Sequence, residues 1–171
     1  MGTGLTDAQR ARIAAADTLF IATAHPGSGA DASHRGGEPG FVRPARGAAG
    51  EDVLVFPDHP GNNMFNTFGN LAASPAAGLL FVDFGGGPTL QLTGTAEVLW
   101  EPEEFAVFPG ARRAVRFHVA GALETAHGTG PRWRLFQRSP FNPPPPAPPP
   151  PRSGAAGPGE GRSPTLERTR S

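Results

Sequence analysis

Polar side chains gather at the point where an apolar strand gives way to a helix in the middle of the chain. Asn62, Asn63, Asn66 and Thr67 follow the strand-like run Val53–Phe56. A helix amino end exposes backbone N–H groups and a partial positive charge, so it can hold an anion. The sequence therefore predicts an anion-binding point at this helix start. The alternative is that Asn62 or Asn63 serves only as the helix N-cap.

Arg35 is the second candidate for binding chemistry. It ends a predicted strand and is followed at once by Gly36 and Gly37, which let a ligand approach the backbone closely. Its planar guanidinium suits a phosphate or a carbonyl edge. Arg43 is a weaker candidate of the same kind. The alternative for either arginine is a solvated charge at the rim of a barrel.

Asp31, Ser33 and His34 have the side chains of a hydrolase but not its geometry. On a strand Asp31 and Ser33 share one face while His34 points to the other. The chain has no nucleophile elbow of the G-x-S-x-G type. We therefore reject a hydrolase and assign no catalytic residue.

Composition excludes several other chemistries. Cysteine is absent and all 15 basic residues are Arg, which excludes disulfides, thiolate catalysis and lysine Schiff bases. Asp58 and His59 could form half of a metal site, but no second pair stands at ligand spacing, so we predict no metal. Net charge is zero, which gives no reason to expect nucleic acid or a membrane surface as a partner. With no apolar signal core and no run long enough to span a membrane, we expect a soluble, cytoplasmic protein.

Short strands joined by turns dominate the predicted elements. A helix from Thr6 to about Ala16 precedes them, with Thr6 as N-cap and Gln9 completing a capping box. Strand spacing of about ten residues favours an antiparallel barrel over a parallel sheet. The predicted extended segments are Thr18–Ala24, Ala30–Arg35, Phe41–Arg43, Val53–Phe56, Gly78–Phe84, Thr89–Trp100, Ala114–Ala122 and Arg132–Gln137.

Three segments carry more detailed expectations. Helical spacing of apolar residues predicts one helix from Asn62 to Ser74, where Pro75 ends it. The run Gly78–Phe84 is almost wholly apolar, which predicts a strand buried on both faces. Thr89–Trp100 alternates, so Trp100 is expected on the apolar face with Leu90, and Leu99 on the wetter face. One or two helical turns are expected in Glu101–Phe108.

The carboxy-terminal region differs in composition from the rest. Residues 1–142 are expected to form the folded domain, and residues 143–171 a disordered tail rich in Pro, Gly and Arg. The proline run favours a polyproline II segment. It is either a linker or, as the alternative, a ligand for an SH3-type domain.

Three motifs together resemble a known family. They are SHRGG at 33–37, PGNNMFNTFGNL at 60–71 and LQLTG at 90–94. Over roughly Ala14 to Pro143 the chain resembles the pyridoxamine 5'-phosphate oxidase-like family of FMN-binding split barrels. It looks most similar to a subgroup known only as oxidase-like. Longer members of that subgroup carry a related half upstream, so the chain resembles a single carboxy-terminal half.

The resemblance implies a fold, a cofactor and a partner. Members are six-stranded split barrels that form homodimers with FMN at the interface. They bind it through an Arg on an early strand, the start of the following helix, and polar residues on the long strand. Asn66 and Thr67 stand where the oxidases have an Arg-Lys pair. The implied cofactor-binding residues are Arg35, Asn62, Asn63, Asn66, Thr67, and Thr89 or Gln91.

The implied function is an FMN-dependent oxidoreductase acting on a small molecule, without nucleic acid or membrane partners. FAD, deazaflavin or haem are alternative ligands. A non-catalytic module that binds flavin or haem on the same barrel is the alternative function.

Overall fold

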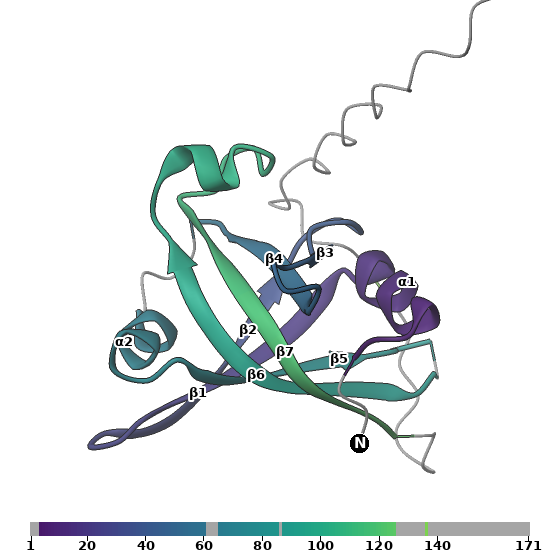
Figure 1. The fold of residues 1–171 in the computed structure, drawn as a ribbon, viewed down its shortest axis with the longest axis horizontal. Helices are drawn as coiled ribbons and strands as arrows, with labels where there is room; N and C mark the ends of the chain where they lie inside the picture. The colour runs from purple at the N-terminus through teal and green to yellow at the C-terminus, as the bar shows by residue number, and fades with distance from the viewer. Residues whose placement is uncertain (1–3, 61–64, 86, 126–135, 137–171) are drawn as a thin grey trace, which may run out of the picture.

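The computed structural model describes residues 4–60, 65–85, 87–125 and 136, which form one curved antiparallel sheet with short helices beside it (Figure 1). The strand order is β2-β1-β5-β6-β7-β4-β3. All neighbouring strands pair antiparallel, so the predicted mainly β, antiparallel fold class is confirmed. The elements are α1 (Asp7–Ala15), β1 (Thr18–His25), β2 (Gly29–Gly36), β3 (Arg43–Arg46), β4 (Asp52–Asp58), α2 (Asn66–Ala73), β5 (Ala76–Val82), β6 (Thr89–Leu99), η1 (Pro102–Phe105) and β7 (Arg113–Thr125).

The sheet has seven strands where the resemblance implied six. The additional strand is β3, which begins where the predicted extended segment Phe41–Arg43 ends and continues to Arg46. Its residues pair with β4, from Arg43 opposite Val55 to Arg46 opposite Asp52. Gly50 closes the hairpin with a φ of 83°, a conformation that glycine adopts without strain. Pro and Gly in this segment therefore form an edge strand and its turn, where a missing N–H is tolerated.

The predicted capping box at the start of α1 is confirmed. The Gln9 N–H donates to the Thr6 hydroxyl oxygen at 3.2 Å, and the Thr6 N–H donates to the Gln9 side-chain oxygen at 3.0 Å. Ile13 is the buried residue of this helix. Asp52 of β4 accepts from the Leu5 N–H at 2.7 Å and from Arg10 at 2.8 Å. These contacts fix α1 against the end of the sheet that carries β3 and β4.

Helix α2 begins later than the sequence predicted. The helix expected from Asn62 starts at Asn66, with Phe65 at the N-cap position and no side chain capping it. Helical periodicity alone does not show where the first intrahelical bond forms, and here the Gly69 N–H donates to the Phe65 carbonyl. The predicted end is confirmed, because α2 stops before Ser74 and Pro75. Phe68 and Leu71 are buried in the main core.

Strand β5 is buried on one face rather than on both. Leu79 and Phe81 are buried, while Leu80 and Val82 are half-buried on the other face. Burial therefore alternates along β5 as in an ordinary strand, although its sequence is almost wholly apolar. The main core between sheet and helices includes Leu19, Ile21, Leu54, Phe56, Leu90, Leu92 and Phe117.

The end of β6 also departs from the predicted alternation. Leu99 is 3% exposed and Trp100 is 60% exposed, the reverse of the expectation. Leu99 packs with Phe105, Phe108 and Ala114 in a second, smaller cluster under η1. The segment expected to form helical turns thus covers the face that looked wetter in the sequence.

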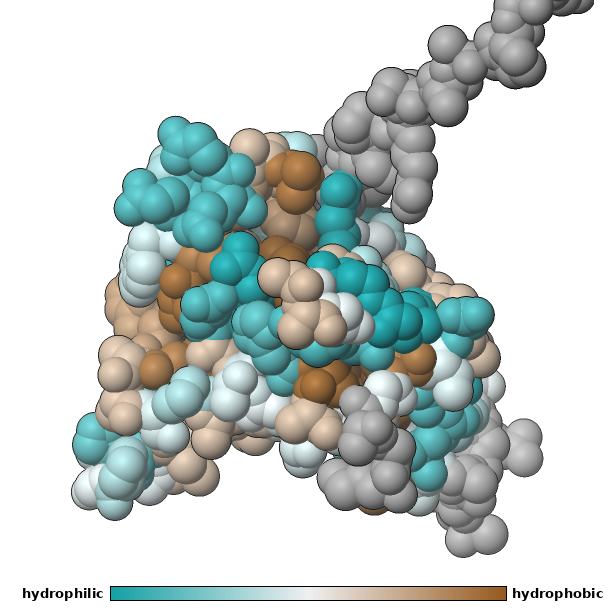
Figure 2. All heavy atoms as spheres, viewed as in Figure 1, coloured by the Kyte–Doolittle hydropathy of each residue, from teal (hydrophilic) through white to brown (hydrophobic). Residues whose placement is uncertain are grey.

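The outer face of β6 and β7 carries charges. Arg116 pairs with Glu97 at 2.7 Å and with Glu104 at 3.5 Å. A hydrophilic area is visible near the middle of the face in Figure 2, where these two strands cross it in Figure 1. No helix in the described residues is long and apolar enough to cross a membrane. The strand expected at Arg132–Gln137 and the tail from residue 143 lie outside the described residues, apart from Phe136.

Candidate functional site

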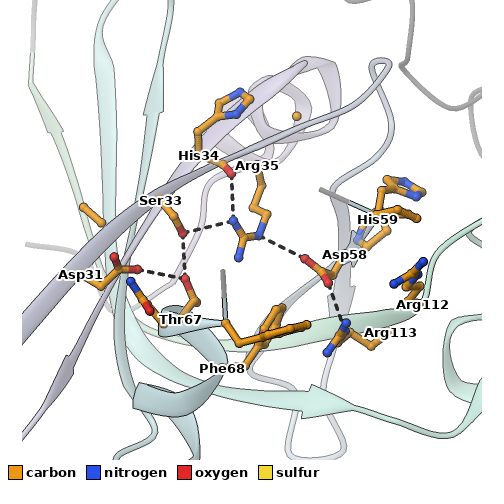
Figure 3. Close-up of a pocket in the computed structure, with 16 residues that line it drawn as sticks. Asp31, Ser33, His34, Arg35, Asp58, His59, Thr67, Phe68, Arg112 and Arg113 are labelled. Carbon is orange, nitrogen blue, oxygen red and sulfur yellow. Dashed lines mark hydrogen bonds and ion pairs between the residues drawn. The ribbon is translucent and has the colours of Figure 1, made fainter. Parts of the chain in front are cut away.

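A pocket of about 560 Å³ opens between β2, the end of β4, the start of α2 and the start of β7 (Figure 3). Four segments that are distant in the sequence meet there because β1 pairs with β2, β4 pairs with β7, and α2 packs on β1. The lining residues are Asp31–Gly36, Pro57–Pro60, Phe65–Phe68, Arg112 and Arg113.

One side of the pocket is a hydrogen-bonded chain across β2 and α2. Asp31, Ser33 and Arg35 alternate along β2 and face the pocket together, as Figure 3 shows. The Thr67 hydroxyl lies 2.8 Å from the Ser33 hydroxyl and 3.2 Å from a carboxylate oxygen of Asp31. Arg35 donates to the Ser33 hydroxyl at 3.1 Å and to the His34 carbonyl at 2.9 Å. These bonds hold the first turn of α2 beside Arg35.

The other side is an ion-paired cluster around Asp58. Its carboxylate lies 3.6 Å from the Arg35 Nε and 3.0 Å from the Arg113 Nε. All three side chains are largely enclosed, with 14% of Asp58, 17% of Arg35 and 11% of Arg113 exposed. The antiparallel register explains the meeting, because Asp58, the last residue of β4, pairs with Arg113, the first of β7.

Aromatic rings surround the guanidinium groups. The Arg113 guanidinium carbon lies 5.0 Å from the centre of the Phe65 ring, 4.8 Å from Phe68 and 5.3 Å from Trp100. Arg35 lies 5.6 Å from the Phe68 ring. These are cation–π distances. Phe65 and Trp100 remain 49% and 60% exposed, so each also offers apolar surface beside the pocket.

Burial controls the protonation behaviour of the cluster. It raises the pKa of Asp58 above its ordinary value, although the nearby Arg35 and Arg113 oppose that rise. Burial lowers the pKa of Arg35, again against the pull of Asp58 and Asp31. Arginine stays protonated despite such a shift. Asp58 is therefore the member of the cluster that can change its charge by taking up a proton.

The structure brings together three of the predicted cofactor-binding residues. Arg35, Asn66 and Thr67 all line the pocket. Arg35 is not the solvated rim charge that was its alternative reading, because its side chain is enclosed and ion-paired. Asn62 and Asn63 lie outside the described residues, and Phe65 occupies the N-cap position of α2.

Thr89 and Gln91 lie at the opposite end of β6 from the pocket. Thr89 pairs with Thr125, whereas Leu99 at the other end pairs with Ala114, next to Arg113. A single copy of the chain therefore does not bring these two residues to Arg35. Arg43 is also elsewhere, 5.4 Å from the Phe108 ring.

Sequence reasoning missed the residues on the β7 side. Arg112 and Arg113 were not singled out, and Asp58 was weighed only as part of a metal site. Their importance follows from the pairing of β4 with β7, across more than fifty residues of chain. The available signal was weak: two adjacent arginines directly before an alternating strand. The rejection of a hydrolase agrees with the structure, since the His34 ring lies 6.0 Å from the Phe20 ring, on the other face from Ser33.

Comparison with known proteins places the chain in a family. Residues 5–133, well over half of the chain, match the family model described as pyridoxamine 5'-phosphate oxidase. The chain belongs to the pyridoxamine 5'-phosphate oxidase family. The resemblance seen in the sequence is thereby confirmed, and the curled antiparallel sheet is the split barrel of this family. No curated protein gives a significant match to the chain.

Solved structures support the fold. The HupZ protein of Group A Streptococcus is 12% identical, with a TM-score of 0.53 over 72% of this chain and 97% of that chain. A candidate pyridoxamine 5'-phosphate oxidase from Lactobacillus delbrueckii is also 12% identical, with a TM-score of 0.54 over 71% and 95%. At this level of identity the likeness establishes a common fold and nothing about activity.

Proposed function

We propose that the protein is a flavin-dependent oxidoreductase that holds FMN in the pocket beside Arg35. One observation carries the proposal: Arg35 opens into the same pocket as the amino end of α2, which no described side chain caps. A helix end without a side-chain cap keeps its first N–H groups available to an anion. An enclosed arginine beside it adds a charge-assisted donor.

The residues around the pocket fit a ligand with a phosphate and a flat ring. Its volume lies within the range of cofactor sites. Arg35 and the exposed Arg112 supply positive charge, while Thr67 fixes the helix end against β2. Phe65 and Trp100 offer exposed aromatic surface for a planar ring. Bound flavin supplies the hydride chemistry, and these side chains bind and orient it.

The proposal includes a homodimer. A row of paired residues crosses the outward face of the sheet, from His34 at the pocket through Phe20, Leu80 and Gln91 to Leu123. Directly paired residues project from the same face. Leu123 is 45% exposed, and Phe20 and Leu80 are half-buried. A second copy covering this face would bring its own Thr89 or Gln91 towards the ligand, which one copy alone does not.

The test is the absorption spectrum of the purified protein. We expect flavin bands, with FMN identified by mass spectrometry of the released ligand, at one flavin per chain. Protein that purifies without flavin should take up FMN on titration. A colourless protein that binds neither FMN nor FAD would falsify the proposal. Reduction of the bound flavin by NADH or NADPH, followed by turnover on oxygen or a quinone, tests the oxidoreductase activity itself.

A second candidate is a binding module without redox turnover. His59 lines the pocket, and imidazole is a common axial ligand of haem. Haem titration monitored by the Soret band distinguishes the two candidates. A tight haem complex lost in His59→Ala, with no flavin uptake, favours the module.

A further inference from the structure

Asp58 stands where the anion of a ligand would bind. Its carboxylate lies between the Arg35 and Arg113 guanidinium groups, at 3.6 and 3.0 Å from their Nε atoms, inside the pocket. Figure 3 shows Asp58 between them, with Arg35 reaching from β2 and Arg113 from β7. A carboxylate in this position neutralises the arginines that an incoming oxyanion needs.

The contacts of Asp58 balance charge without satisfying the donors. The Arg113 Nε is buried and has no aligned hydrogen-bond acceptor among the described residues, even though Asp58 is near. The contact of Arg35 with Asp58, at 3.6 Å, is also too long for a hydrogen bond. A buried donor without an acceptor is unfavourable. An oxyanion whose oxygen atoms point along these N–H bonds can therefore bind the two arginines better than Asp58 does.

We propose that Asp58 is an internal competitor for the ligand's oxyanion, and that binding of a doubly charged oxyanion draws one solvent proton onto its carboxylate. This inference rests on the proposed anion site and adds a specificity-determining residue to it. The favoured ligand class is a phosphate or sulfate dianion, because it can outcompete a single carboxylate for the two arginines.

The charges around Asp58 support this coupling. Arg35, with Asp31 behind it, faces Asp58 from β2, and Arg112 and Arg113 face it from the start of β7. His59 is its neighbour in sequence and also acts on it. The described first turn of α2 contributes Asn66, Thr67 and Phe68, none of which titrates. A dianion placed beside the carboxylate adds like charge, which favours the protonated form of Asp58.

The experiment uses sulfate, which stays doubly charged across the pH range of interest. Isothermal titration calorimetry of the whole protein at pH 6, in two buffers with different ionisation enthalpies, measures protons taken up on binding. We expect wild type to take up a substantial fraction of one proton per sulfate. Asp58→Asn should take up none and should bind sulfate more tightly, by about tenfold at pH 8.

Asp31→Asn is the matched control, because it removes the same charge from the same pocket without vacating the position between the arginines. It should keep the proton uptake and change sulfate affinity less than Asp58→Asn. Equal effects of both variants, weaker binding by Asp58→Asn, no sulfate binding, or no proton uptake by wild type would each overturn the inference. If Asp58→Asn does not fold, His59→Gln decides it: this variant removes the imidazole beside Asp58 and should keep the wild-type proton uptake, and loss of the uptake would overturn the inference.

Titration with FMN separates this inference from the proposed function. A protein that shows the proton-linked sulfate site but ignores FMN refutes the flavin proposal and leaves the role of Asp58 standing. If wild type and Asp58→Asn bind FMN with equal affinity at pH 8, the flavin proposal stands and the proposed role of Asp58 is refuted.

Discussion

Arg35 is the residue whose removal should affect the site most. Arg35→Ala removes a largely enclosed charge and its bond to Ser33. A hydrogen bond to a charged group contributes about 1.5–3 kcal/mol, so we expect FMN to bind about tenfold to a hundredfold more weakly. Titration followed by flavin fluorescence measures the change.

Arg43→Ala is the control for that variant. Arg43 is the other arginine singled out on an early strand, but it packs on Phe108 away from the pocket. We expect its FMN affinity to match wild type. Equal loss in both variants would mean that the effect of Arg35 comes from overall charge and not from the pocket.

At the residue scale, the sequence identified Arg35 and Thr67 as polar groups of the site but did not identify Asp58, the carboxylate that pairs with Arg35. Arg35 was found because it ends a strand before two glycines, and Thr67 because it lies near a helix start. Both are local patterns. The pairing of Asp58 with Arg113 depends on how β4 and β7 align, and no local spacing encodes that alignment.

At the scale of elements, hydrogen bonds to the Asp52 side chain hold α1 against β4. Its side chain is 3% exposed and accepts bonds from the Leu5 N–H and from Arg10. Burial alone would raise its pKa, but the bonds from Leu5 and Arg10 outweigh burial and leave the pKa below its ordinary value of 3.8. Asp52→Asn removes the carboxylate that the Leu5 N–H and Arg10 bind, so its unfolding midpoint in urea at pH 7 should lie at a lower urea concentration than that of wild type.

The same residue gives a prediction with a definite sign in pH. Below 3.8 the unfolded chain binds a proton at Asp52 that the folded chain still rejects. The free energy of unfolding therefore falls as the pH drops through this window, and Asp52→Asn should lose that part of the slope. Asp7→Asn, which removes a fully exposed partner of Arg10, should keep it. Identical acid profiles for wild type and Asp52→Asn would contradict the assignment.

Gly94 marks the irregularity that bends the central pair of strands. The register between β6 and β7 shifts at Thr93 and Gly94, and a Cβ on Gly94 would collide with the backbone oxygen of His118. Gly94→Ala should destabilise the fold by about 1–3 kcal/mol, measured by urea unfolding. Gly69→Ala is the opposite case, since a Cβ there meets nothing within 4 Å and α2 gains helix propensity. A neutral Gly94→Ala would show that the strands shift freely.

Elements were predicted well where their signals are local and poorly where tertiary contacts decide. The capping box of α1 and the Pro that ends α2 act within a few residues, and both were correct. The predicted start of α2, the predicted bounds of the strand at Phe41–Arg43 and the predicted exposure of Leu99 were wrong. Pairing with β4 makes β3 a strand, and cover by η1 buries Leu99. Neither cause is visible in the segment itself.

At the scale of the whole molecule, the fold class followed from strand spacing and the family from three motifs. What the sequence could not supply was the relation between copies, because Thr89 and Gln91 lie far from Arg35 within one chain. In the proposed dimer, a second copy covers the row of outward-facing residues that ends at Leu123, and its own Thr89 or Gln91 then approaches the ligand.

Leu123→Glu tests that dimer. A charge buried in the proposed apolar contact should shift the protein from dimer to monomer in size-exclusion chromatography with light scattering. Val107→Glu is the matched control, because Val107 is 47% exposed, close to the 45% of Leu123, but lies beside η1. The Val107→Glu variant should remain dimeric. A wild-type protein that is already a monomer would refute the dimer.

The most direct test of the account is the difference in affinity between FMN and riboflavin for flavin-free wild-type protein. The two ligands share the ring and differ in the phosphate that Arg35 and the amino end of α2 are proposed to hold. The account predicts that FMN binds at least about tenfold more tightly, as expected for a charge-assisted contact. Equal affinity for the two flavins, or binding of neither, would contradict it.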